Sequence, residues 1–64
     1  MKIIEHKAGG AIVGLSSDEI YVLSNALNEV CNGIDLPEFE TRLGASKGAV
    51  RELLEDLLRS IEDL

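Results

Sequence analysis

The chain carries few side chains that could form a catalytic or metal-binding centre. His6 is its only histidine and Cys31 its only cysteine. A metal site needs several Cys, His or acidic ligands at suitable spacing, and nucleophilic catalysis needs a Ser or Cys with a base beside it. Neither set can be assembled here, so we expect no enzyme activity, no metal and no cofactor. Cys31 is predicted to be a small, buried apolar side chain.

Polar side chains at helical spacing form one candidate binding surface. Asparagine is a poor helix former, so exposed positions that only maintain solubility would more naturally be lysine or glutamate. A tyrosine anchor beside adaptable amides is typical of a protein-binding patch. Alternatively, the amides hold a neighbouring loop or hairpin by hydrogen bonds to its backbone. Both interpretations stay open for Tyr21, Asn25, Asn28, Glu29 and Asn32.

A second candidate surface is acidic. The chain has 12 acidic and 6 basic residues, which gives a formal net charge of −6. Binding to nucleic acid requires Lys and Arg that displace condensed counterions, so we expect a larger basic protein as the partner rather than nucleic acid. The acidic residues near the C-terminus suit either a solvated helix face or docking into a cationic cleft, such as the substrate groove of a nuclease. The candidates are Glu52, Glu55 and Asp56.

The size and composition of the chain predict one small domain over residues 1–64. A domain of this length buries only about 60% of the surface of its unfolded chain, which leaves little room for a deep active site. Hydrophobic residues make up 45% and charged residues 28%, the balance of a folded soluble protein. A lone cysteine excludes an internal disulfide, and no apolar run reaches the roughly 20 residues that span a bilayer. We therefore expect a cytoplasmic protein with no membrane partner.

Residues 2–15 are predicted to form a β-hairpin. Two β-branched runs flank Gly9-Gly10, a pair that suits a two-residue turn. We expect the resulting apolar face to lie on the helices and Ile3 and Ile12 to lie on the other face. An open strand edge can pair with a second chain, so a homodimer through the hairpin is a prediction beside the monomer. The predicted register pairs Ala8 with Ala11, His6 with Val13 and Ile4 with Leu15.

Three helices are predicted over residues 17–32, 36–43 and 47–62. The first begins at a capping box made by Ser16 and Glu19, and Gly33 is expected to end it in a left-handed conformation. Asp35 and Glu38 repeat the capping pattern for the second helix, which Gly44 ends. Ser46 caps the third. The apolar stripes predicted to form the core are Ile20, Leu23, Leu27, Val30, Cys31 and Ile34 in the first helix and Val50, Leu53, Leu54, Leu57, Leu58 and Ile61 in the third.

Residues 36–54 resemble a helix-turn-helix, with a short helix, a glycine turn and a serine-capped helix. In a DNA-binding regulator Ser46, Lys47 and Arg51 would face the groove. However, residues 35–64 hold 8 acidic and 4 basic side chains, and Glu40 stands where the motif usually has a small packed residue. We therefore favour a structural helical corner, with DNA binding as the alternative. The predicted fold is α+β: an N-terminal hairpin followed by three helices, the last two in a helix-turn-helix-like corner.

Two segments resemble a known group of bacterial proteins. Residues 25–34 (NALNEVCNGI) and 37–44 (PEFETRLG) are similar to small immunity proteins of polymorphic-toxin systems, including contact-dependent growth inhibition. The resemblance extends over residues 16–58. It implies a cytoplasmic protein that binds one cognate toxin domain, often a nuclease, and neutralises it. It assigns no binding residues to this chain.

Overall fold

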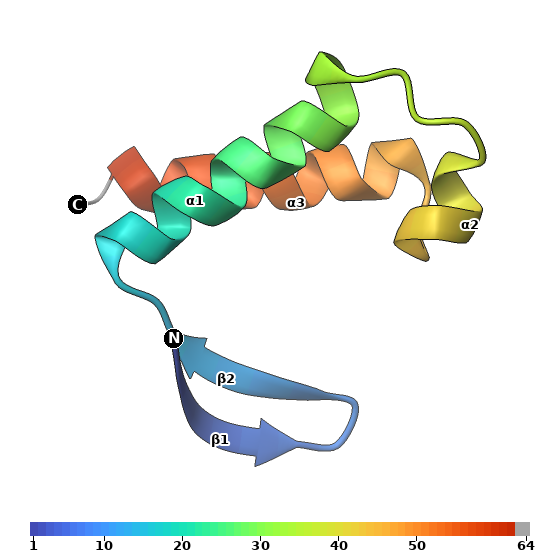
Figure 1. Cartoon of the computed structure of the whole chain (residues 1–64). Helices are drawn as coiled ribbons and strands as arrows, with labels where there is room; N and C mark the ends of the chain where they lie inside the picture. The colour runs from blue at the N-terminus through green and yellow to red at the C-terminus, as the bar shows by residue number, and fades with distance from the viewer. Residues whose placement is uncertain (63–64) are drawn as a thin grey trace.

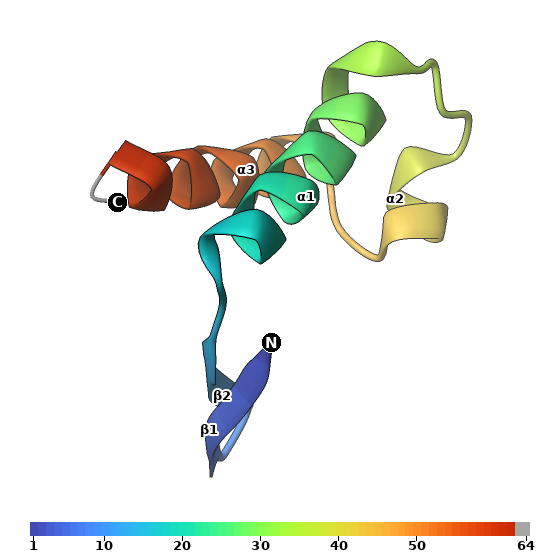
Figure 2. The ribbon, with the colours of Figure 1, turned by 60° about the vertical axis from the view of Figure 1, so that its left-hand side comes forward.

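The computed structural model describes residues 1–62 and confirms the α+β class, with an antiparallel hairpin followed by three helices (Figure 1). Helices α1 and α3 run antiparallel and lie side by side, while the hairpin projects away from them (Figure 2). The elements are β1 (Lys2–Lys7), β2 (Gly10–Gly14), α1 (Ser17–Asn28), a π-helical turn η1 (Glu29–Gly33), α2 (Phe39–Leu43) and α3 (Lys47–Glu62).

Helix α1 begins as the sequence predicts. The hydroxyl of Ser16 accepts a hydrogen bond from the Glu19 N–H at 3.1 Å, and the Glu19 carboxylate accepts one from the Ser16 N–H at 2.8 Å. This reciprocal pair satisfies two amide groups that have no partner inside the helix. The backbone of Ser16 is extended, so the chain turns sharply into the helix at this residue.

The end of this helix differs from the prediction. Regular α geometry stops at Asn28, and the chain continues as the wider turn η1, which the N–H of Ile34 closes by donating to the Glu29 carbonyl at 3.0 Å. The prediction that Gly33 is left-handed is wrong, because the glycines with positive φ are Gly9 and Gly44. The π-helical hydrogen bond ends the helix and removes the need for a left-handed residue.

The second helix is shorter than predicted, and the expected capping box of Asp35 and Glu38 is wrong. Proline disfavours helical backbone in the residue before it, and the chain stays non-helical through Pro37. Glu38 then adopts a left-handed conformation with φ 55° and caps α2 without a side-chain hydrogen bond. As predicted, Gly44 ends α2, with φ 80°, and the hydroxyl of Ser46 caps α3 by accepting from the Ala49 N–H at 3.1 Å.

The hairpin forms, but its predicted register is wrong. Within the hairpin, only Gly9 has positive φ, so the turn is Ala8-Gly9, as in a four-residue turn that needs glycine at its third position. A bulge at Ile4 shifts the pairing once more and joins Ile3 to Val13, so Ile3 and Ile12 do not share a face. The observed pairs are Lys7 with Gly10, His6 with Ala11, Glu5 with Ile12, Ile3 with Val13 and Lys2 with Gly14.

The core is a thin seam between α1 and α3. The two helices use the same spacing: one buried or half-buried line runs through residues 20, 24, 27 and 31, and the other through residues 50, 54, 57 and 61. Cys31 is 2% exposed, as predicted. The predicted stripes were too broad, because four of their residues are exposed: Leu23, Ile34, Leu53 and Leu58. The buried residues are Ile20, Ser24, Cys31, Val50 and Leu54.

The expectation that the hairpin packs on the helices is also wrong. Every residue from Met1 to Val13 is exposed, and the two views show the hairpin standing apart from the helix pair (Figures 1 and 2). Only Leu15 and Ser16 separate β2 from α1, and the capping box fixes the direction in which the chain leaves the helix. An ion pair between the Met1 amino group and Glu19 joins the base of the hairpin to α1. One side of the helix pair is therefore left uncovered.

Candidate binding surfaces

The predicted amide residues lie together along one edge of α1, which we call the amide side: Tyr21, Asn25, Asn28 and Asn32. The first three each follow a residue of the buried line by one position, so they point about 100° away from the core. All four are exposed, and Tyr21 is 49% exposed. The structure therefore assembles these side chains into one surface.

The amides contact each other rather than a neighbouring segment. The Asn32 side-chain amide donates to the Asn28 side-chain oxygen at 3.0 Å. Among the hydrogen bonds of residues 1–62, none joins these side chains to the hairpin or to a loop backbone. Glu29 does not belong with them, because its carboxylate lies over Gly33, where a β-carbon would overlap it. The role of the amide side in binding stays a prediction.

The acidic residues Glu52, Glu55 and Asp56 are all exposed on α3. Glu52 and Asp56 each lie two positions after a buried residue, so they point away from α1 on the outer surface of the helix. We call these three residues the acidic face. Asp56 forms an ion pair with Arg59, and an exposed pair of this kind contributes little to stability. The acidic face is thus exposed and contributes little to stability.

The residues of the DNA-binding alternative lie at the start of α3. Lys47 and Arg51 are exposed, but the hydroxyl of Ser46 is used in the helix cap. Helix α2 has only five residues, and α3 packs mainly against α1. In a DNA-binding helix-turn-helix the first helix crosses the DNA backbone while the second enters the groove. This short α2, followed by a helix with an acidic outer surface, does not favour DNA readout.

A third surface, which the sequence did not predict, lies on the edge of the helix pair opposite the amide side. Leu23, Val30 and Leu53 each precede a buried residue by one position. Because α1 and α3 are antiparallel, residues with the same offset from the buried line leave the pair on the same side. Leu23 and Leu53 are 42% and 52% exposed. We call this surface the apolar side.

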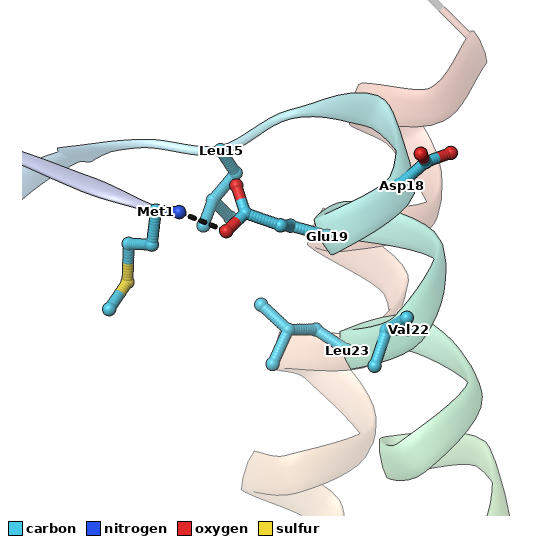
Figure 3. A pocket seen from close by; sticks show the side chains of 6 residues that line it. All are labelled: Met1, Leu15, Asp18, Glu19, Val22 and Leu23. Carbon is cyan, nitrogen blue, oxygen red and sulfur yellow. Dashed lines mark hydrogen bonds and ion pairs between the residues drawn. The ribbon is translucent and has the colours of Figure 1, made fainter.

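A shallow pocket of about 310 Å³ adjoins the apolar side where the hairpin meets α1 (Figure 3). The Met1 amino group and the Ser16 N–H donate hydrogen bonds to Glu19, and these bonds lower the pKa of Glu19 from 4.5 to about 2. From the sequence, Leu23 was expected in the core, and Met1 and Val22 had no expected role. The pocket is lined by Met1, Leu15, Asp18, Glu19, Val22 and Leu23.

Over residues 1–62, the structure holds no cluster of three or more His, Cys, Asp or Glu side chains placed to bind a metal ion. Within the same residues, no helix has the length and apolar character needed to cross a membrane. Comparison with protein families, with curated proteins and with solved structures finds no match to this chain.

Proposed function

We propose that this chain is a non-enzymatic protein-binding module that acts as a small acidic inhibitor. The observation that carries the proposal is the exposure of its apolar residues. Eleven large apolar side chains of residues 1–62 are more than 40% exposed, while only five residues of this part of the chain are buried. Exposed apolar surface of this extent marks association with other macromolecules. Residues 1–62 thus have the exposed apolar surface of a binding protein.

The charge of the chain indicates the chemistry of the partner. The acidic face lies on the outside of α3 and the chain carries a formal charge of −6. Complementary charge raises the rate of encounter and rejects partners of like charge. A basic enzyme, such as a nuclease whose cleft binds phosphate, is complementary to this face. Together with the resemblance to immunity proteins that residues 25–34 and 37–44 suggest, this supports our proposal of a cytoplasmic inhibitor that neutralises one cognate toxin by direct binding.

Co-expression tests the proposal. The product of each gene flanking the gene for this chain is expressed in a bacterial host, alone and together with the chain. We expect one product to arrest growth alone and to be neutralised by the chain. The double variant Glu52→Lys, Glu55→Lys should lose protection, whereas Asp35→Lys, Glu40→Lys, with the same charge change at other exposed sites, should keep it. If no flanking product is toxic and neutralised, the proposal is wrong.

A further inference from the structure

We infer that two copies of this chain exchange hairpins, so that the hairpin of each copy packs on the apolar side of the other. The two surfaces in question are the hairpin itself and the side of the helix pair formed by Leu23, Val30 and Leu53. The hairpin is exposed, and on the apolar side Leu23 and Leu53 are exposed while Val30 is half-buried. The inference does not depend on the toxin partner. It leaves exposed the acidic face on the outside of α3 and the large apolar side chains Tyr21 and Leu58 on the amide side.

The chain exposes more area than a compact monomer, and the excess is close to the area that each partner of a stable dimer buries. The chain exposes 4859 Å², whereas the scaling for compact monomers gives about 4000 Å² for a mass of 6.9 kDa. The excess of about 860 Å² is close to the roughly 800 Å² that each partner contributes to a standard interface. The radius of gyration, 13.0 Å, also exceeds the roughly 10.7 Å of a compact chain of this length. If the hairpin of a second copy covered each chain, the exposed area and the radius of gyration would both approach the values of a compact protein.

Charge makes the hairpin of a second copy a suitable occupant. The hairpin carries Lys2 and Lys7 against the single acid Glu5. The rest of the chain carries the other 11 acidic residues and only 4 basic ones. The helix pair is acidic overall, and Asp18 and Glu19 line the pocket beside its apolar side. A basic hairpin is complementary in charge to this surface, whereas two hairpins placed face to face would bring like charges together. This favours packing of hairpin on helix over packing of hairpin on hairpin.

Both faces of the hairpin can supply apolar contacts. Ile12 pairs with Glu5 and Val13 pairs with Ile3, and neighbouring residues of a strand point to opposite faces. The hairpin of the second copy can therefore present an apolar side chain whichever face it turns toward the helices. The pocket between Met1 and Leu23 borders the apolar side and is open to receive such a side chain.

The connection between β2 and α1 explains why the hairpin packs on a second copy rather than on its own helices. The capping box at Ser16 and the ion pair between Met1 and Glu19 hold the base of the hairpin at the edge of α1. The hairpin then extends away from the helix pair (Figure 1). In a dimer with a two-fold axis, the hairpin of each chain covers the apolar side of the other, so the two contacts are identical. This is the closed arrangement of symmetric dimers.

Cross-linking between two marked chains tests the exchange. Both chains carry Cys31→Ala and affinity tags of different mass, and circular dichroism checks that each variant keeps its helices. One chain carries Ile12→Cys or Val13→Cys, one for each hairpin face, and the other carries Leu53→Cys. Leu58→Cys is the matched control, because Leu58 leaves α3 on the amide side. The two chains are unfolded and refolded together and treated with a short thiol-to-thiol cross-linker.

We expect a covalent product that contains both tags when a hairpin cysteine is combined with Leu53→Cys, in at least tenfold higher yield than with Leu58→Cys. Equal yields from the two positions would overturn the inference, as would products that join only hairpin to hairpin. A single-chain mass of 6.9 kDa for the unaltered protein at micromolar concentration would overturn it as well.

Discussion

Leu53 and Leu58 lie on the same helix with nearly equal exposure, 52% and 47%, yet they leave the helix pair on opposite sides. Leu53 precedes the buried Leu54 and faces the apolar side, whereas Leu58 follows the half-buried Leu57 and faces the amide side. The two residues are five positions apart, which is about 140° around the helix. They therefore report separately on the two edges of one small structure.

Ser24 occupies a core position where an apolar residue would be more stable. It is 3% exposed and its hydroxyl has no hydrogen-bond partner among the described residues. A buried, unpaired hydroxyl is unfavourable, so we expect Ser24→Ala to raise the free energy of unfolding by up to about 1 kcal/mol. Urea unfolding at fixed protein concentration measures the change, with the exposed Ser17→Ala as control. A loss of stability in Ser24→Ala would show that the hydroxyl has a partner.

Replacement of Gly44 and of Gly48 by alanine should change the melting temperature in opposite directions. Gly44 ends α2 with φ 80°, a conformation that costs roughly 1 kcal/mol for a residue with a β-carbon. Gly48 lies inside α3, and the nearest atom to an added β-carbon is the Ser46 hydroxyl at 4.0 Å. We expect Gly44→Ala to lower the melting temperature and Gly48→Ala to raise it, since alanine is the better helix former. Calorimetry measures the two melting temperatures, and a change in the same direction for both variants would contradict the backbone conformations at Gly44 and Gly48.

The free energy of unfolding should depend on acid pH through Glu19. The hydrogen bond from the Met1 amino group, followed by that from the Ser16 N–H, lowers the pKa of Glu19 in the folded chain to about 2, from 4.5. A lowered pKa stabilises the fold above pH 4.5, and this contribution is lost as the pH falls through about 2. The difference in stability between the native chain and Glu19→Gln should therefore shrink over this range. A carboxyl titration by NMR with its midpoint near 4.5 would contradict the contact.

Binding to DNA should be weak. Lys47 and Arg51 are the exposed bases at the start of α3, and the acidic face follows them on the same helix. A titration with duplex DNA at about 50 mM salt should show no saturable binding, because few phosphates can be neutralised. Tight binding with a steep salt dependence, lost in Lys47→Ala and Arg51→Ala, would instead establish the helix-turn-helix as a DNA-binding surface.

Local signals in the sequence were reliable where a few residues decide the structure. The Ser16 capping box, the Gly44 stop and the Ser46 cap depend on neighbouring backbone and side-chain groups, and all three are present. The register of the hairpin was wrong because either Ala8-Gly9 or Gly9-Gly10 can form a two-residue turn. The bulge at Ile4 has no separate signal in the local sequence.

The candidate surfaces were predicted in part. The helical spacing grouped the amide residues and placed the acidic face outside, because both follow from the period of a helix. The apolar side was missed, since a periodic pattern marks a broad stripe and does not show how much of it a small domain covers. Leu23 and Leu53 belong to such stripes and remain exposed, because the hairpin stands away from the helices.

The central claim is that the apolar side of the helix pair is covered by a second chain. Sedimentation equilibrium at micromolar concentration tests it on three proteins: the native chain, Leu53→Lys and Leu58→Lys. We predict twice the chain mass of 6.9 kDa for the native chain and for Leu58→Lys, and the single mass for Leu53→Lys. A single mass for the native chain, or equal masses for the two lysine variants, would contradict the covering of the apolar side by a second chain.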